Sequence, residues 1–411
     1  MIINKKKNLQ YTVILFLVCN VILIFLYFFA GDMSLQYQSW RKGPLIHENS
    51  IYSAPHAYKA FYLTTIVWFN IYFSLFLFLK NKKKFFFVMF VCIISLLITE
   101  VALKIYIYNS NFITEYIPHP TRFYTTRINL KDNLQKALVA TDSNGFRSYK
   151  NLQIDKPIKE KRIFVIGDSS SFGHYLKYRD TFSAVLEKRL QQDNINANVI
   201  LASCPGHTTY QGLLIIKESI LKFNPDIIIV SYNNDPSKEY KQEKDRAFIH
   251  NKFEYCLFKL LYKSDYFLLT QKVISDWKIK LSPVKSKPVL IPRVTLEDYK
   301  KNIQEIIKLG EQHNFIPIFL RMPYNYKTLK NFPELNDLFT DQRYPSLLTD
   351  FCTKNKINFI DFDTLWGGEN KDESLFEFEG NRIAHFHPSK EGHLKMAEAL
   401  YYKIKGILSN E

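Results

Sequence analysis

The short apolar run Ile163–Ile166 is the feature that most constrains how this chain folds. Its β-branched and aromatic side chains are typical of a parallel strand that is buried on both faces. Gly167 ends the run, and Asp168 and Ser169 follow where a strand would pass into a helix. Ligands of an open α/β sheet bind beyond the carboxyl ends of the strands, so a serine at this point is placed for chemistry. The segment is not the G-x-S-x-G nucleophile elbow, because a serine occupies position 171.

Apolar strands alternate with helical patterns along the rest of the chain. The predicted strands are Ile163–Ile166, Asn198–Ala202, Ile227–Ser231, Ile316–Leu320 and Ile357–Phe362. The helical patterns lie near residues 180–191, 209–223, 296–313, 345–355 and 389–406. Such alternation predicts an α/β fold in which helices cover both faces of a parallel sheet of about five strands. Residues 236–290 interrupt the pattern with an aromatic-rich stretch, and we interpret them as an insertion, either a lid or a docking surface.

Three apolar stretches precede this domain, at about 11–30, 60–79 and 85–103. The first is long enough to cross a bilayer, and its length argues against a cleaved signal peptide. Lys5–Lys7 precede it, and a lysine-rich turn at 80–84 separates the other two. The positive-inside rule then predicts three transmembrane helices, with everything after residue 107 outside the cytoplasm. This topology predicts a multi-pass protein of an inner (cytoplasmic) membrane, with its large domain periplasmic or extracellular.

The chain therefore divides into a membrane domain over residues 1–107, an extended connector over 108–160 and an α/β domain over 161–411. The connector is rich in Tyr, Asn and Thr, and we expect it to pack against the α/β domain. Its Asn144-Gly145 pair predicts a turn between short strands. Glu100 lies near the outer end of the third span. It is either a functional group or, as we favour, the ion-pair partner of Lys104 one helical turn away.

A net charge of +16 is compatible with nucleic acid, an anionic membrane or acidic substrates. The lysines are scattered or flank apolar stretches, so the lipid bilayer accounts for part of the excess. We expect no nucleic-acid partner. No H-E-x-x-H, P-loop or dinucleotide motif occurs, so we also expect no cofactor and no metal. Three cysteines lie outside the apolar stretches and lack zinc spacing: Cys204, Cys256 and Cys352. The sequence permits one disulfide among them.

Four short blocks fall at strand ends or before the last helix. Ser169 ends the first strand, Gly206 follows the second, Asn234 follows the third, and His387 precedes the last helix. In this order the blocks resemble those of the SGNH hydrolases, also called GDSL esterases and lipases, over about residues 112–411. This resemblance implies a flavodoxin-like, three-layer domain with strand order 2-1-3-4-5. The segments at 142–147 and 291–299 are also similar to a membrane-anchored bacterial branch of the family.

The resemblance also implies the roles of these residues in acyl transfer. Ser169 would be the nucleophile and His387 the base that takes its proton. The backbone N–H groups of Ser169 and Gly206 and the side-chain amide of Asn234 would form the oxyanion hole. We interpret Asp168 as structural.

Other residues of the same types compete for these roles. Ser170 and Ser171 are alternatives to Ser169, although the alignment of the block favours Ser169. His385 and His393 lie on either side of His387, and we interpret both as packing or solvent residues.

Two positions depart from the family pattern. Ala384 stands where the family has an aspartate that orients the histidine, and Tyr232 stands where it has a glycine. Three arrangements then remain open: a Ser–His dyad, a main-chain carbonyl that orients His387, or an acid supplied by Glu377 or Glu379. Side chains alternate along an extended strand, so the two glutamates should share one face and point together toward the site or toward solvent.

Two functional hypotheses follow. The first is a membrane-anchored extracytoplasmic serine esterase or acyltransferase that acts on an ester such as O-acylated cell-envelope carbohydrate. A membrane partner would supply the acyl donor to a transferase. The second is a catalytically inactive SGNH-fold envelope protein that binds glycan or scaffolds a partner, and the missing aspartate is its main support.

Overall fold

The computed structural model describes residues 65–71, 94, 97–105, 116–119, 121–134, 137–238, 261, 264, 266–267, 270, 291–379 and 382–409. The chain separates into two compact units. One consists of Met1–Tyr124 with His250–Lys287, and the other of Thr125–Ile249 with Pro288–Glu411. Most of the predicted insertion therefore groups with the N-terminal part of the chain.

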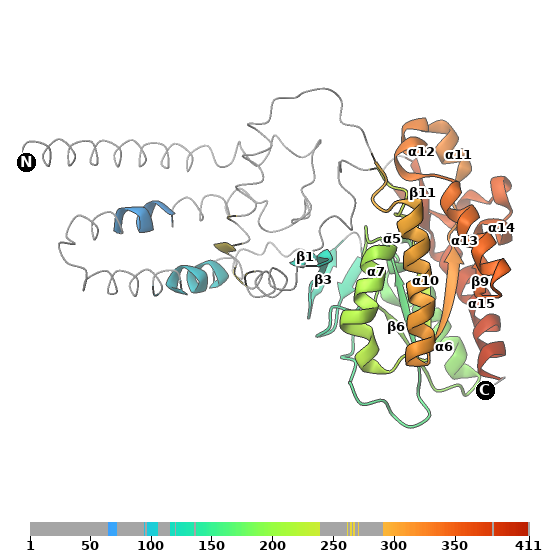
Figure 1. Ribbon diagram of the computed structural model, residues 1–411, viewed down its shortest axis with the longest axis horizontal. Helices are drawn as coiled ribbons and strands as arrows, with labels where there is room; N and C mark the ends of the chain where they lie inside the picture. The colour runs from blue at the N-terminus through green and yellow to red at the C-terminus, as the bar shows by residue number, and fades with distance from the viewer. Residues whose placement is uncertain are drawn as a thin grey trace, which may run out of the picture. The chain divides into compact units, whose positions relative to one another are not determined.

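A parallel sheet of five strands forms the centre of the second unit (Figure 1). Its strands are β5 (Lys161–Gly167), β6 (Ala197–Leu201), β7 (Ile227–Ser231), β8 (Ile316–Arg321) and β9 (Asn358–Asp361). The order β6-β5-β7-β8-β9 is the predicted 2-1-3-4-5, and each strand boundary lies within two residues of the prediction. Central β5 is apolar throughout because alternate side chains enter two cores: Ile163 and Val165 on one face, Phe164 and Ile166 on the other.

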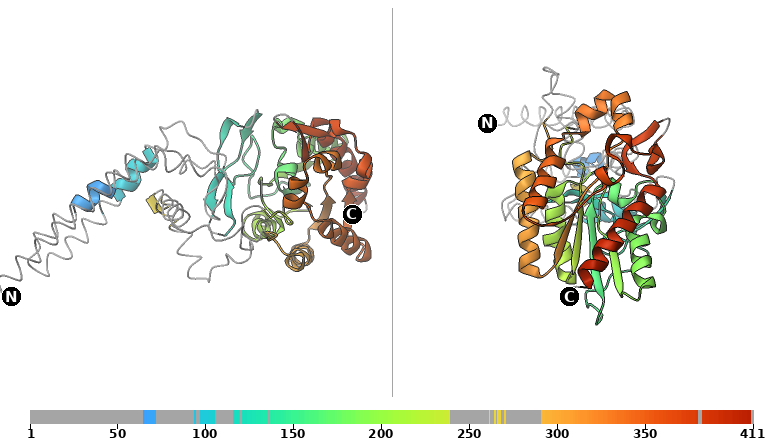
Figure 2. Two further views of the ribbon diagram at one scale, coloured as in Figure 1. Left: turned by 90° about the horizontal axis from the view of Figure 1, so that it is seen from above. Right: turned by 90° about the vertical axis from the view of Figure 1, so that its right-hand side faces the viewer.

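Two helical layers cover the sheet, so the predicted three-layer α/β fold is confirmed (Figure 2). Helices α6 (Phe182–Gln192) and α15 (Lys390–Leu408) pack together on one face. Helices α7 (Thr209–Ile215), α10 (Leu296–His313) and α13 (Arg343–Lys354) cover the other. The helical pattern predicted at 209–223 continues beyond α7 as one π-helical turn and one 3-10 turn, which end at Phe223.

Helix α10 illustrates why the longer helices were predictable. Thr295 accepts the backbone N–H of Asp298 at 3.1 Å and caps the first turn. The residues that the helix buries recur every three or four positions, so one apolar stripe faces the sheet. They include Tyr299, Ile303, Ile306 and Leu309.

Several short elements were not predicted. Helices α11 (Tyr326–Asn331) and α12 (Pro333–Phe339) follow β8, and α14 (Phe362–Leu365) follows β9. Strands β10 (Phe376–Glu379) and β11 (Arg382–Pro388) form an antiparallel hairpin immediately before α15. Elements of four to seven residues are too short to show a clear periodicity.

The connector packs on the α/β domain through its last residues. Phe146 lies in the core against the rings of Phe164 and Phe223, and Arg147 bridges antiparallel to Leu201 at the edge of the sheet. The Asn144-Gly145 turn is present: Gly145 has φ +81°, and the Asp142 carboxylate accepts the N–H groups of Asn144 and Phe146. Strands β3 (Lys131–Leu134) and β4 (Ala137–Ala140) pair as a hairpin just before it.

The first unit is described at a limited number of residues. Residues 65–71 and 97–105 are helical, and β1 (Tyr116–His119) pairs with β2 (Phe123–Thr126) at its end. Glu100 forms the predicted ion pair with Lys104 at 2.6 Å. Its carboxylate also accepts the hydroxyl of Ser264 at 2.8 Å and the N–H of Tyr266 at 3.1 Å, so this carboxylate is fully engaged.

The predicted membrane spans fall largely outside the described residues. The stretch at 11–30 lies wholly outside them, and those at 60–79 and 85–103 are described only in part. Among the helices that the structure does describe, none combines the length and the apolar character needed to cross a bilayer.

Candidate active site

The first functional side chain lies directly after the central strand. Asp168 caps the short helix α5 (Ser169–Phe172) by accepting the N–H of Ser170, so Ser169 occupies the first helical position. The hydroxyl of Ser170 donates to the carbonyl of Phe386, and that of Ser171 donates to Ser203. Of the three consecutive serines, it is Ser169 whose hydroxyl contacts His387.

His387 lies in β11 and joins the serine to an acid. Its Nε2 is 2.7 Å from Ser169 Oγ. Its Nδ1 forms a hydrogen bond and ion pair with the carboxylate of Glu379 on β10. A carboxylate can only accept, so Nδ1 carries the proton and Nε2 is left to accept the serine hydroxyl. This is the geometry of a Ser–His–acid triad.

Glu379 brings a carboxylate to His387, whereas position 384 carries none. Ala384 is completely buried, whereas the hairpin brings Glu379 to the imidazole across the turn. Phe378 between the two glutamates is 59% exposed, and Glu377 and Glu379 are both partly buried, as alternation along a strand predicts. The alternatives of solvent-facing glutamates and a main-chain carbonyl that orients His387 do not match this geometry.

The charge state of Glu379 suits this position. Burial raises its pKa, but the hydrogen bond from His387 and the charges of His387, His385 and His174 outweigh burial and lower the pKa below its usual value. The group therefore stays ionised and can stabilise the imidazolium that forms during catalysis.

The loops that carry the predicted oxyanion donors are tied to the serine turn. The N–H of Cys204 donates to the carbonyl of Gly167 at 3.0 Å, and the N–H of Asn233 donates to Asp168 Oδ2 at 2.6 Å. Strands β5, β6 and β7 are neighbours, so Ser169, Gly206 and Asn234 follow adjacent carboxyl ends of the sheet.

The two backbone donors are open. Within the described part of the chain, the N–H groups of Ser169 and Gly206 donate to no protein acceptor. Gly206 adopts φ +73°, which favours glycine, and its carbonyl accepts a hydrogen bond from the buried Arg293. The arrangement can stabilise negative charge on a carbonyl oxygen placed beside Ser169.

Asp168 is structural, in agreement with the prediction. Its carboxylate is completely buried and accepts hydrogen bonds from the N–H groups of Ser170 and Asn233. Burial raises the pKa of Asp168, and the two backbone hydrogen bonds and the charge of His387 act against that rise. The side chain thus fixes the Asn233–Asn234 loop against the serine turn.

Tyr232 is accommodated by a glycine elsewhere. A Cβ on Gly212 of α7 would lie 2.4 Å from the Tyr232 hydroxyl and 2.6 Å from its ring. The helix can lie over the bulkier strand end only because residue 212 has no side chain.

The neighbouring histidines are packing residues. His393 is completely buried, accepts the N–H of Phe182 at 3.0 Å and stacks on that ring. His385 is 6% exposed and packs against Phe339 with ring centroids 5.1 Å apart. Burial lowers the pKa of each to about 3, so both are neutral.

Sequence reasoning missed the aromatic pair that follows the serine turn. His174 stacks on His387 with ring centroids 5.2 Å apart, and Tyr175 meets His387 edge-on at 6.2 Å. Both side chains are partly buried. The signal available in the sequence was their distance of only a few residues from Ser169.

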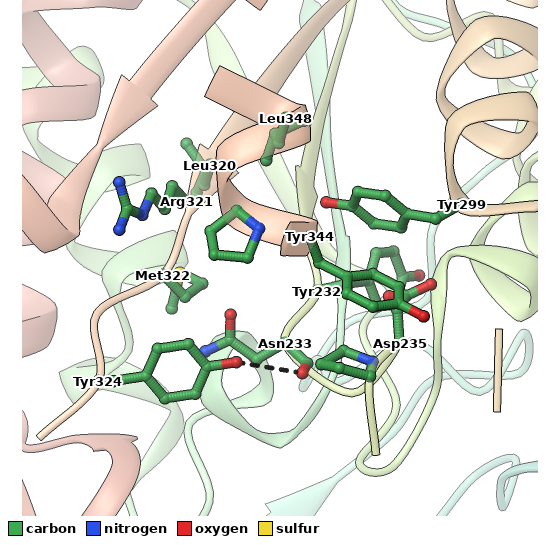
Figure 3. A pocket seen from close by; sticks show the side chains of 12 residues that line it. Tyr232, Asn233, Asp235, Tyr299, Leu320, Arg321, Met322, Tyr324, Tyr344 and Leu348 are labelled. Carbon is green, nitrogen blue, oxygen red and sulfur yellow. Dashed lines mark hydrogen bonds between the residues drawn. The ribbon is translucent and has the colours of Figure 1, made fainter. Parts of the chain in front are cut away.

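A tyrosine-lined pocket includes Asn233 in its wall (Figure 3). Its free volume is about 310 Å³, including space that is open to solvent. The Tyr324 hydroxyl in it lies 3.5 Å from the carbonyl of Asn233. Neither Ser169 nor His387 lines this pocket, so we do not assign it to the substrate. The tyrosines that line it are Tyr232, Tyr299, Tyr324 and Tyr344.

The cysteines do not form a disulfide where they are described. Cys204 and Cys352 are buried thiols, and burial raises the pKa of Cys352 to about 12. Cys256 lies outside the described residues. No group of three or more His, Cys, Asp or Glu side chains in the described ranges could hold a metal ion.

Comparison with known proteins agrees with the fold. Residues 165–395, more than half of the chain, match the model of the GDSL-like Lipase/Acylhydrolase family. The comparison with curated proteins gives no significant match.

Three similar solved structures each cover about 60% of this chain at low sequence identity. A lipase/acylhydrolase from Enterococcus faecalis is 16% identical, with 60% of this chain and 96% of that chain covered and a TM-score of 0.38. The esterase EstA from Pseudoalteromonas sp. is 13% identical, with 61% and 99% covered and a TM-score of 0.36. An acetyl xylan esterase from Geobacillus stearothermophilus is 13% identical, with 59% and 94% covered and a TM-score of 0.37.

Proposed function

The chain belongs to the GDSL-like lipase/acylhydrolase family and is an ester hydrolase; on that premise we propose that it is a membrane-anchored serine esterase acting outside the cytoplasm on O-acylated cell-envelope carbohydrate. The observation that carries the serine mechanism is the continuous contact of Ser169, His387 and Glu379.

The geometry supports a two-step acyl transfer. His387 Nε2 takes the hydroxyl proton as Ser169 Oγ bonds to the ester carbonyl carbon. The N–H groups of Ser169 and Gly206 and the Asn234 amide donate hydrogen bonds to the carbonyl oxygen as it becomes negatively charged. The carbon–oxygen bond to the alcohol then breaks, and the alcohol oxygen takes the proton from His387. Water attacks the acyl-serine by the same steps in reverse and releases the acid.

A transferase would differ only in the second step. A sugar hydroxyl in place of water would accept the acyl group from Ser169, and His387 would take its proton in the same way. A membrane partner would then supply the acyl donor, because the lipid bilayer separates the proposed site from cytoplasmic acyl carriers. Hydrolysis is our first proposal, since it needs no second protein.

The membrane anchor is supported by the sequence pattern and by one described helix. The apolar stretches and lysine clusters predict three spans that precede the hydrolase domain. In the helix at 97–105, the side chains of Leu97, Ile98, Val101 and Ile105 are each more than half exposed. An apolar face of this kind suits contact with lipid chains. The carbohydrate substrate is inferred from this envelope location.

A serine-directed fluorophosphonate probe tests the function. The full-length protein in detergent should form a covalent adduct on Ser169, located by peptide mass spectrometry, and should hydrolyse a small aryl acetate. Ser169→Ala should abolish the adduct and lower kcat by at least about 10³-fold. Ser170→Ala is the matched control and should retain labelling. If Ser169→Ala hydrolyses the ester at the wild-type rate, the serine mechanism is wrong.

A further inference from the structure

The turn that follows α5 holds a tyrosine in a strained conformation beside the catalytic histidine. The N–H of Leu176 donates to the carbonyl of Gly173 at 3.0 Å and closes the turn. Tyr175 within it has φ +69°, in the left-handed region that L residues other than Asn and Asp seldom adopt. Backbone strain of this kind persists where the surrounding structure enforces it, and it concentrates at functional sites.

Arg147 enforces the turn. Its buried guanidinium donates to the carbonyl of Gly173 at 2.9 Å and also to the carbonyls of Phe172 and Leu176. Three carbonyls around the turn thus converge on one rigid cation, which lies 4.6 Å from the Phe172 ring. Tyr175 cannot relax its backbone without breaking hydrogen bonds in a buried region.

The turn presents two rings to the catalytic imidazole. His174 lies 5.2 Å from His387 at an interplanar angle of 30°, and the rings of His174 and Tyr175 are 4.3 Å apart. Burial raises the pKa of Tyr175, and the negative charges of Glu379 and Glu377 raise it further. An aromatic surface therefore borders His387, whose Nδ1 contacts the Glu379 carboxylate.

The reaction geometry decides which part of an ester this surface meets. His387 gives its proton to the leaving alcohol, so groups that surround the imidazole face the alcohol part of the ester. Gly206 and Asn234 face the carbonyl oxygen instead. We propose that Tyr175, with His174, forms the subsite for the alcohol part and selects a neutral polyhydroxylated ring such as a pyranose. This inference rests on the proposed esterase function and adds a specificity residue to it.

The chemistry of the subsite matches a sugar ring. The flat phenol ring can lie against the apolar C–H face of a pyranose, and its hydroxyl can hydrogen-bond to a ring substituent. The Glu379 carboxylate, which contacts His387, would repel an anionic alcohol such as a phosphorylated glycerol.

The test compares esters that share an acetyl group and differ in the alcohol. Tyr175→Gly removes the ring and suits φ +69°, so the turn should be retained. We expect kcat/KM to fall about tenfold or more for a 6-O-acetyl methyl glucopyranoside, mainly through KM, and to change less than about twofold for ethyl acetate. Tyr402→Ala, at an exposed position of α15, is the control and should change neither.

Two outcomes would overturn the proposal. An equal loss on both acetates would make Tyr175 a support for His387 and not a specificity residue. A loss that instead follows acyl length, when butyrate replaces acetate on the same glucoside, would place the ring beside the acyl group.

A binding measurement separates this inference from the esterase function. Saturation-transfer NMR with methyl β-glucopyranoside on full-length Ser169→Ala protein should show transfer to the glycoside, and the added Tyr175→Gly change should abolish it. If the wild-type protein hydrolyses no ester but this transfer depends on Tyr175, the subsite stands and the esterase proposal fails. Transfer that is indifferent to Tyr175 rejects the subsite.

Discussion

Glu379 shows how a carboxylate can reach the histidine from a sequence position other than 384. The hairpin register sets Glu379 opposite Arg382, and a shift in that register between Phe376 and Phe378 lets His387 approach the carboxylate. Ala384 meanwhile fills a completely buried position. The carboxylate therefore lies on β10, the strand paired with β11, eight residues before the histidine in the sequence.

Replacement of the acid tests this arrangement. Glu379→Gln should lower kcat for a small aryl acetate by about 10²- to 10⁴-fold, because an amide no longer holds the imidazole in the productive tautomer or stabilises its charge. Glu377→Gln on the same strand is the matched control and should stay within about threefold of wild type. Ala384→Asp should give no rate increase and should lower thermal stability, because it buries a carboxylate. A faster Ala384→Asp enzyme would instead indicate a dyad.

His385 should make stability depend on pH. Burial lowers its folded-state pKa to about 3, whereas an unfolded histidine titrates near 6.5. Between these values the unfolded chain binds more protons, so stability is lost as pH falls below about 6.5. The loss approaches about 1.4 kcal/mol per pH unit for each such histidine.

The measurement is the melting temperature between pH 7.5 and pH 4.5. His385→Phe keeps an aromatic ring against Phe339 and should flatten this dependence while leaving stability at pH 7.5 nearly unchanged. The exposed His313→Gln at the end of α10 is the control and should leave the slope intact. An unchanged slope in His385→Phe would mean that another group produces the acid sensitivity.

At the scale of elements, the contact of α7 with the end of β7 is set by Gly212 and Tyr232. Gly212→Ala would ordinarily stabilise a helix by about 1 kcal/mol, but its Cβ would lie 2.4 Å from the Tyr232 hydroxyl. We expect Gly212→Ala to destabilise the domain by about 1–3 kcal/mol through overpacking. Because β7 leads into the Asn234 loop, esterase activity should fall as well.

A double-mutant cycle makes this prediction specific. In a Tyr232→Ala background the obstructing ring is gone, so Gly212→Ala should become neutral or stabilising in chemical denaturation. If Gly212→Ala is equally destabilising in both backgrounds, the two residues are not coupled and the steric explanation is wrong.

At the scale of the whole molecule, the proposed envelope substrate depends on the predicted membrane topology. The lysine clusters predict the hydrolase domain on the outer side of the membrane. A reporter enzyme that works only in the periplasm, fused after residue 110, should therefore be active. A second fusion, at residue 82 in the lysine-rich turn, should be inactive. Activity at residue 82 and none at residue 110 would place the domain in the cytoplasm and contradict the envelope substrate.

Much of the fold followed from local patterns. Strand β7 is a continuous apolar run because both of its faces are covered, and α10 shows a clear amphipathic stripe and cap, so both were located closely. The hairpin of β10 and β11 was missed, because its strands are short and only their pairing defines them. The helix at 326–331 and that at 333–339 were missed for the same lack of periodicity.

For the site, the sequence by itself determined the order of the blocks that carry Ser169, Gly206, Asn234 and His387, because each follows from a local pattern of strand end or helix start. Only the tertiary structure decided that Glu379 contacts His387 and that Tyr175 borders it. Strand pairing and turn geometry fix those contacts, and both depend on residues far apart in the chain. One contact depends on a register shift in a hairpin, and the other on a turn held by Arg147, which is distant in sequence. Neither feature produces a periodic pattern in the residues that it positions.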